Sequence, residues 1–298
     1  MEAADALASA PKRSAGRRLA DLFHGRSWLQ LGGLLSGPLA WLVIGYLGSL
    51  AVLLIASFWS VSALTGEVSQ TFTIDNFKTL VEDPVYRTIA WRTVRTAGLV
   101  TITDALLAFP IAFYMAKVAS RRARAALVVA ILMPLWSFYL VKVYAWRTML
   151  SANGVINWAL GPLHIHGPGY GTAAVWLVMS YLWLPYMILP IFAGLESIPN
   201  SLLSASEDLG ASPFTTFRRV ILPLAFPAVV AGSIFTFSLT LGDYVTPQIV
   251  SNTQLIGNLI FINFTQNLPL ASAYATVPLA VMVVYLLIAR RLGAFEQL

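Results

Sequence analysis

The sequence has no cysteine and very few charged residues. Because cysteine is absent from all 298 positions, disulfides, thiolate metal sites and a cysteine nucleophile are excluded. Charged residues make up only 11% of the chain and hydrophobic residues 58%, which is well outside the range of soluble globular domains. Together these proportions predict an integral membrane protein that crosses the bilayer several times.

Motifs for catalysis and for nucleotide binding are also absent. None of the lysines follows a glycine, so there is no Gly-x-x-x-x-Gly-Lys-Ser/Thr loop, and no HExxH or GxSxG motif occurs. His164 and His166 form a His-x-His pair, but no acidic residue or cysteine accompanies them at ligand spacing. We therefore expect no catalytic residue, no metal site and no cofactor bound by this chain.

Long stretches without charge separate the few charged residues, as between Arg147 and Glu196. A hydrocarbon core of about 30 Å requires about 20 apolar residues per helix. The sequence accordingly predicts an all-α integral membrane protein with six transmembrane helices, at 38–63, 90–116, 126–148, 172–194, 224–246 and 269–289.

The basic residues indicate how these spans are oriented. Most of them fall in the N-terminal tail, after the second span, at Arg218 and Arg219 after the fourth, and at Arg290 and Arg291 after the last. By the positive-inside rule this side is the cytoplasm, with both termini on it. The net charge of +6 is thus explained by topology and predicts no nucleic-acid partner. The expected parts are cytoplasmic tails at 1–37 and 291–298, a first span at 38–63, an external loop at 64–89 and a core of five spans at 90–290.

One polar segment, SASEDLGASPFTTFRRVILP at 204–223, interrupts the apolar runs. Pro199 suits the first turn of a helix that Gly210 can end in a left-handed cap. Ser212 and Pro213 can then start a second helix, as N-cap and first-turn residue. On the first helix Leu202, Ala205, Ser206 and Leu209 share one side, and Ser204, Glu207 and Asp208 the other. The pattern predicts a short amphipathic helix-turn-helix, either a docking element or an ordinary solvated loop.

Two acids stand at an unfavourable place in this segment. Glu207 and Asp208 occupy the last turn of their helix, where the macrodipole disfavours anions by a few tenths to about 1 kcal/mol. A positive group should offset this cost. The candidates are Arg218 and Arg219, or a basic surface on a cytoplasmic partner.

This segment resembles the cytoplasmic EAA loop of ABC-importer permeases, Glu-Ala-Ala, three residues, Gly, nine residues, then Ile-x-Leu-Pro. Ser204, Ala205 and Ser206 stand at the first three places, Gly210 at the glycine, and the end reads Val220, Leu222, Pro223. Ser204 departs from the family's glutamate. Further stretches resemble the permeases of spermidine/putrescine-type importers: FTIDNF at 72–77, MPLWSFYLVKVYAWRTML at 133–150, NGVIN at 153–157 and LGDYVTPQIV at 241–250.

The resemblance implies a type I ABC-importer permease fold with a cytoplasmic coupling helix between the fourth and fifth spans. It implies that the loop at 196–223 docks on a separate ATP-hydrolysing subunit, which would hold ATP and Mg. The implied partners are two ATP-binding subunits, a second permease subunit that is identical or homologous, and an external substrate-binding protein, all at a bacterial inner membrane. The coupling contacts would come from Ser204, Ala205, Ser206, Glu207, Asp208, Gly210, Ala211, Ser212 and Pro213.

Ionisable residues inside spans are costly and usually face a cavity or a partner, which selects Asp104, Lys142 and Asp243. Two acids among aromatic rings would suit a cationic amine, although aromatic residues also gather at membrane interfaces without binding anything. Lys142 and Asp243 stand where similar permeases usually have Arg and often have Glu. The candidates for a substrate path are Asp104, Trp136, Tyr139, Lys142, Tyr144, Asp243 and Tyr244, with Trp146, Trp183 and Tyr186 as further aromatic residues.

Two functions remain open at this point. The favoured one is a permease subunit that moves polyamines or a related small solute inward, driven by ATP hydrolysis on a partner. The alternative is a secondary transporter driven by an ion gradient, since that class also lacks a phosphate-binding loop. The docking segment, and the absence of a broken apolar segment repeated in both halves, favour the permease.

Overall fold

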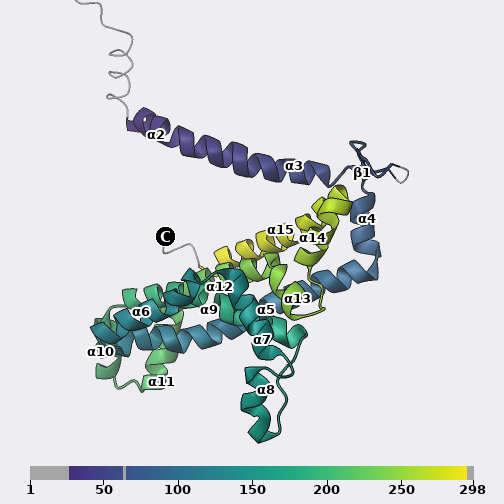
Figure 1. Ribbon diagram of the computed structural model, residues 1–298. Coiled ribbons are helices and arrows are strands. Elements are labelled where there is room, and N and C mark those ends of the chain that lie inside the picture. The colour runs from purple at the N-terminus through teal and green to yellow at the C-terminus, as the bar shows by residue number, and fades with distance from the viewer. Residues whose placement is uncertain (1–26, 63–64, 294–298) are drawn as a thin grey trace, which may run out of the picture. The chain divides into compact units, whose positions relative to one another are not determined.

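The computed structural model describes residues 27–62 and 65–293 and is mostly helical (Figure 1). The chain divides into two units, Met1–Ile55 and Ala56–Leu298, each of which is described by itself. The basic residues of the N-terminal tail, Lys12, Arg13, Arg17, Arg18 and Arg26, lie outside the described residues.

The first unit contains one long apolar helix, built from α2 (Ser27–Trp41), the π-helical η1 (Leu42–Leu47) and α3 (Gly48–Ala56). The part that could span a membrane is Leu31–Ala56, of which the most apolar window is only 6% buried. A helix that is apolar on every side is suited to a membrane.

The predicted first span, 38–63, is therefore misplaced. The helix begins earlier, within the predicted tail at 1–37, and ends at Ala56. It ends there because the Asn76 side chain donates to the carbonyls of Ser57 and Trp59, at 2.9 and 2.8 Å, so those carbonyls accept from a side chain.

The predicted external loop at 64–89 contains regular structure. Strands β1 (Ser60–Val61) and β2 (Val68–Ser69) form a short antiparallel pair, followed by α4 (Asp75–Glu82). The next helix begins at Pro84, where the Asp83 side chain accepts from the Val85 N–H at 2.8 Å as an N-cap.

Three long helices form the core of the second unit: α5 (Pro84–Phe113), α9 (Thr172–Ser197) and α12 (Leu222–Gly242), with each pair in contact. The π-helical η2 (Tyr114–Val118) extends α5. Small residues such as Ala97, Ala108 and Ala112 lie on the buried side of α5, which lets the helices approach closely. Gly194 of α9 meets Ala228 of α12 where any larger side chain would collide.

The predicted third span, 126–148, is not one straight helix. It consists of α6 (Arg121–Trp136) and α7 (Tyr139–Leu150), which are bent by 92° at Ser137 and Phe138. The Pro134 carbonyl, which would accept from Phe138 in a continuous helix, accepts instead from the Ser137 hydroxyl at 2.8 Å and from Lys142 Nζ at 3.0 Å. Because two side chains satisfy this carbonyl near the end of α6, the chain can turn there.

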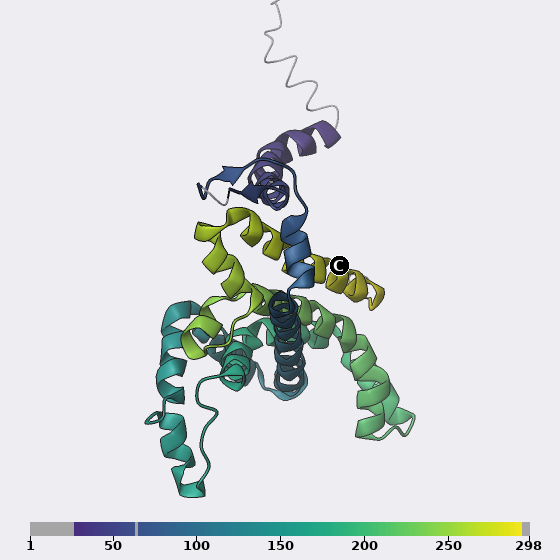
Figure 2. The same cartoon turned by 90° about the vertical axis from the view of Figure 1, so that its right-hand side faces the viewer.

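The remaining elements lie at the ends of this core. In Figure 1, α10 and α11 lie at one end of the bundle and α13 and α14 at the other. Figure 2 shows α5 nearly end-on, with the teal α8 and the green α11 extending on opposite sides of it. The bounds are α8 (Val155–Leu160), η3 (Gly161–Leu163), α10 (Asn200–Asp208), α11 (Pro213–Thr216), η4 (Phe217–Ile221), α13 (Val245–Val250), α14 (Ile256–Gln266) and α15 (Leu268–Arg291).

Within the described residues, five helices are long and apolar enough to cross a membrane, or six if α6 and α7 count as one broken span. The predicted fourth and sixth spans agree closely with α9 and α15. The predicted fifth span, 224–246, is too long, because α12 ends at Gly242 and the chain turns at Asp243.

Candidate functional site

The predicted helix-turn-helix is present as α10 and α11. Gly210 has φ of +76°, the left-handed conformation expected of it. Its N–H donates to the Glu207 carbonyl at 2.8 Å, and the Ala211 N–H donates to the Ser206 carbonyl at 3.1 Å. This pair of bonds is a Schellman motif, which ends α10 and satisfies carbonyls that the helix leaves open.

The start of α11 also follows the sequence pattern. The Ser212 hydroxyl accepts from the Thr215 N–H at 3.3 Å, and Pro213 occupies the first turn. The Ser206 and Thr216 hydroxyls are 2.8 Å apart and join the two short helices. Pro199, expected in the first turn of α10, is its N-cap instead.

The side chains of α10 divide differently from the predicted two sides. Leu203 packs against the core cluster of α5, α9 and α12, and Ser206 is half-buried. Leu202 and Leu209, expected to share an apolar side, are 43% and 88% exposed, and Phe214 of α11 is 71% exposed. Of the other predicted coupling residues, Ala211 is half-buried and Ser204, Ala205, Glu207 and Asp208 are exposed. Large apolar side chains thus surround the turn at Gly210 and leave a surface with no partner in the described chain.

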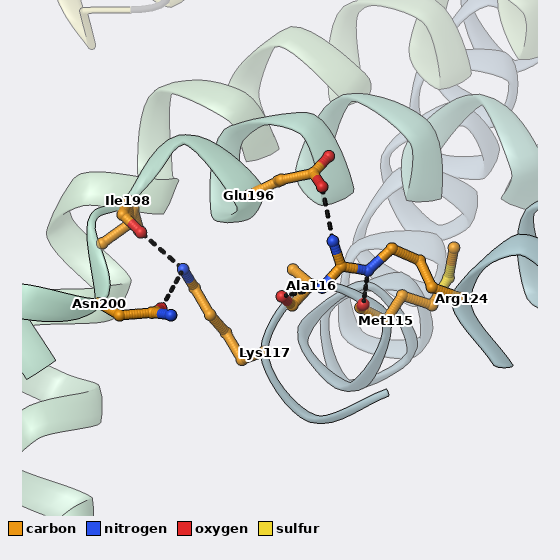
Figure 3. A network of polar contacts seen from close by, with 7 residues as sticks. All are labelled: Met115, Ala116, Lys117, Arg124, Glu196, Ile198 and Asn200. Carbon is orange, nitrogen blue, oxygen red and sulfur yellow. Dashed lines mark hydrogen bonds and ion pairs between the residues drawn. The ribbon is translucent and has the colours of Figure 1, made fainter. Parts of the chain in front are cut away.

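A polar network joins this segment to the bundle (Figure 3). Lys117 of η2 donates to the Ile198 carbonyl at 2.6 Å and to Asn200 Oδ1 at 3.4 Å. Arg124 of α6 forms an ion pair with Glu196 of α9 at 2.7 Å.

The same guanidinium group also donates to the carbonyls of Met115 and Ala116, both at 2.9 Å. It thereby supplies hydrogen-bond donors to carbonyl groups at the end of η2, where the helix itself provides none. The sequence does not predict this network, because nothing in the spacing of Lys117, Arg124 and Glu196 shows that three helix ends meet there.

The acids of α10 are not neutralised inside the described chain. Within residues 27–62 and 65–293, neither Glu207 nor Asp208 forms an ion pair with Arg218, Arg219 or any other basic residue. Of the two candidates for offsetting these acids, Arg218 and Arg219 or a basic surface on a partner, the two arginines form no ion pair with them in this structure.

A second group of predicted residues meets at the other end of α12. Asp243, only 8% exposed, ends that helix, and its carboxylate accepts from the N–H groups of Val245 and Thr246 at 2.9 and 3.1 Å. Tyr139 of α7 donates to the same carboxylate at 2.7 Å, and the Thr246 hydroxyl donates at 2.6 Å. Asp243 therefore caps α13 and fastens it to α7.

This carboxylate lies beside an open pocket of about 390 Å³. The Tyr139 and Trp183 rings are stacked at 6.0 Å between centroids, and both line the pocket with Tyr244. No Lys or Arg among the described residues forms an ion pair with Asp243. The structure thus brings together Tyr139, Asp243 and Tyr244 with Trp183, an arrangement of one anion and three aromatic rings.

The other predicted path residues do not line this pocket. Asp104 is fully buried on α5, and neither of its carboxylate oxygens has a hydrogen-bond partner among the described residues. Lys142 is engaged with the Pro134 carbonyl, so it stabilises the bend between α6 and α7. Trp136 and Tyr144 are 87% and 55% exposed, as expected of rings that face lipid or a partner.

Comparison with known proteins identifies the family. Residues 95–295, about two thirds of the chain, match the model of the binding-protein-dependent transport system inner membrane component. The chain belongs to this family. It is therefore a permease subunit of an ABC importer, and the family match does not support the secondary transporter considered as the alternative.

Similar proteins agree with this assignment. The chain is 41% identical to the inner membrane ABC transporter permease protein YdcU of Escherichia coli strain K12, over 97% of each chain. It is 32% identical to the spermidine/putrescine transport system permease protein PotB of Haemophilus influenzae, over 72% of this chain and 78% of PotB. The predicted resemblance to this group of permeases is confirmed.

Solved structures of ABC importers share the fold. A permease of the bacterial alginate ABC transporter, solved with a periplasmic protein that holds an alginate pentasaccharide, covers 93% of this chain with a TM-score of 0.72 at 18% identity. Another structure of an alginate importer gives a TM-score of 0.67 at 19% identity. The type I permease fold is therefore confirmed.

Proposed function

We propose that this permease subunit moves polyamines, or a closely related cationic amine, into the cell. The observation that carries the proposal is the pocket at Asp243, where a carboxylate without a cationic partner in the described chain lies beside stacked aromatic rings. An ionisable residue inside a membrane protein usually marks a substrate or ion path, and ammonium groups also bind to aromatic faces. The name of the PotB relative, a spermidine/putrescine permease, supports the same substrate class.

Energy would come from other polypeptides. The assembly we propose has two ATP-binding subunits, which hold ATP and Mg, and a second permease subunit that is identical or homologous to this one. An external binding protein would deliver the substrate. The exposed Leu209 and Phe214 at the turn between α10 and α11 are suited to a groove on the ATP-binding subunit. A basic surface there would also balance Glu207 and Asp208, which would place α10 and both chain termini in the cytoplasm.

Movement of this segment would reach the bundle through the network in Figure 3. Lys117 connects the start of α10 to the end of α5, and the pair between Arg124 and Glu196 connects α6 to α9. Because these bonds join helix ends, a displacement of α10 would move long helices as rigid bodies. Closure of the ATP-binding subunits would in this way change which side of the membrane the pocket at Asp243 faces.

The test is uptake by the full importer, assembled with its partner subunits in proteoliposomes. Putrescine and spermidine should be transported and should stimulate ATP hydrolysis when the binding protein is present, whereas an uncharged diol of similar length should do neither. Asp243→Asn should weaken polyamine uptake while the ATP-binding subunits remain associated. Equal uptake of the diol and the diamine would contradict the substrate class.

Asp104→Asn is the matched control, because it makes the same chemical change at a buried acid that does not line the pocket. If both variants lose uptake equally, the pocket at Asp243 is not the particular determinant of charge recognition. If neither does, Asp243 lies outside the path.

A further inference from the structure

An apolar groove lies between α5 and the segment formed by η4 and α12, away from the pocket at Asp243. Its volume is about 520 Å³. The Phe109 and Phe217 rings meet edge to face at 5.6 Å between centroids and form part of its wall. The other lining residues on the second segment include Leu222, Phe226 and Val229.

The groove is open on the outer surface of the bundle. Leu106 on its rim is 71% exposed, and Phe226 is 41% exposed. A water-filled groove with such a lining would be unstable, because every exposed aromatic ring would be hydrated at a cost. Its position along α5 and α12, both of which are candidate membrane spans, makes a hydrocarbon chain the natural occupant.

A positively charged residue, Arg218, lies next in sequence to Phe217 of the groove lining, although it is not itself a lining residue. Arg218 belongs to η4, one residue beyond Phe217 and four before Leu222, so it lies on the same side of the helix as the groove lining. It is exposed, and among the described residues its guanidinium group has no hydrogen bond or ion pair. A cation without a partner beside an apolar groove complements a molecule with an anionic head and a hydrocarbon tail.

We propose that this groove binds an anionic phospholipid, with one acyl chain against Phe109, Phe217 and Phe226 and the phosphate at Arg218. The site lies on the side of the bundle from which the coupling segment extends, since η4 directly follows α11. Bound lipid would support the π-helical turn of η4, which carries motion from α11 into α12. The proposal does not depend on which solute is transported.

The test compares lipids retained by the importer complex after purification in mild detergent. The complex is exposed to phosphatidylglycerol and phosphatidylethanolamine with identical acyl chains, and bound lipids are counted by native mass spectrometry. Arg218→Gln should lower retention of phosphatidylglycerol about fivefold, the factor expected for one cation beside an anionic lipid surface, and leave phosphatidylethanolamine unchanged.

Arg122→Gln is the matched control. Arg122 is likewise exposed and without a partner among the described residues, but it lies on α6 and does not line the groove. This variant should retain phosphatidylglycerol normally. An equal loss in both variants would show a general effect of surface charge and would overturn the specific site.

A second pair of variants tests the acyl chain. Val229→Trp should fill the groove and lower retention of both lipids, whereas Val284→Trp, on the exposed side of α15, should not. If Val229→Trp does not assemble, Leu106→Trp at the rim repeats the test without requiring space inside the bundle. Unchanged retention in the groove variant that assembles would mean that another helix, such as one from the second permease subunit, covers the groove.

Discussion

The continuous helix Pro213–Gly242, made of α11, η4 and α12, has a turn at each end where one helix stops and another starts, yet the two turns are built differently. Before α12, Gly210 and Ser212 form an exposed turn, and the capping bond from Thr215 to Ser212 is 3.3 Å long. After α12, Asp243 is buried, and its carboxylate accepts from two backbone N–H groups and two hydroxyl groups.

The difference follows from access to water. The first N–H groups of any helix lack partners within the helix. At an exposed turn, water can satisfy whatever the cap does not, so a serine suffices. Inside a bundle an unsatisfied N–H costs about 1 to 3 kcal/mol, so a strong acceptor must be supplied by the chain. We expect that substitutions at the buried turn cost more than substitutions at the exposed one.

Asp243→Ala should have the largest effect on stability. It removes the acceptor for Val245, Thr246 and Tyr139 together, and we expect the free energy of unfolding to fall by about 3 kcal/mol. Unfolding of the purified chain by SDS, followed by circular dichroism, measures this change. A loss no larger than that of an exposed cap would mean that the buried turn is not specially dependent on Asp243.

Gly210→Val should have the next largest effect, at the exposed turn. With φ of +76°, a β-branched residue is strained by about 1 to 2 kcal/mol, although a new Cβ would meet no neighbouring atom. The variant should still insert in the membrane, but the importer that contains it should hydrolyse ATP on its ATP-binding subunits without transport. Gly210→Asn, which tolerates the left-handed conformation, should keep both activities coupled. Normal uptake by Gly210→Val would refute the coupling role.

Tyr139→Phe should cost about 1.5 kcal/mol, since it removes one hydroxyl donor to Asp243 and keeps the stacked ring. Tyr144→Phe is the control on the same helix, because Tyr144 is exposed and its hydroxyl has no hydrogen bond among the described residues. The thermal unfolding midpoint of purified Tyr139→Phe should be lower than that of purified Tyr144→Phe. Equal midpoints would show that the bond from α7 does not stabilise the turn.

Ser212→Ala should have the smallest effect, about 0.5 to 1 kcal/mol, because the cap is exposed and long. The same SDS titration applies. A loss as large as that of Asp243→Ala would contradict the difference expected between the two turns, whereas a barely measurable loss would support it.

The sequence was a good guide where a local rule decides the backbone. The left-handed cap at Gly210, the N-cap at Ser212 and the continuous α9 and α15 were all predicted from residues close together in the chain. It was a poor guide where a distant side chain competes with the helix. Examples are the end of α3 at Ala56, where Asn76 satisfies the following carbonyls, and the bend after Trp136, where Lys142 contacts the Pro134 carbonyl.

The residues predicted for the substrate path show the same limit of prediction from local sequence. Asp104 and Asp243 appeared equivalent as acids within apolar runs, but one has no hydrogen-bond partner among the described residues and the other accepts four donors. A residue in the middle of a helix finds the neighbouring N–H groups already used by the helix, whereas one at a helix break finds them free.

From the sequence alone it follows that this chain resides in a membrane, which family it resembles, and where the exposed turn between α10 and α11 lies. These properties follow from composition and from short-range patterns. Only the tertiary structure decided which acid joins Tyr139 and Trp183 at a pocket, and that Lys117, Arg124 and Glu196 meet at three helix ends. The physical reason is that packing places residues in contact that are tens of positions apart, and no local periodicity records which of them will meet.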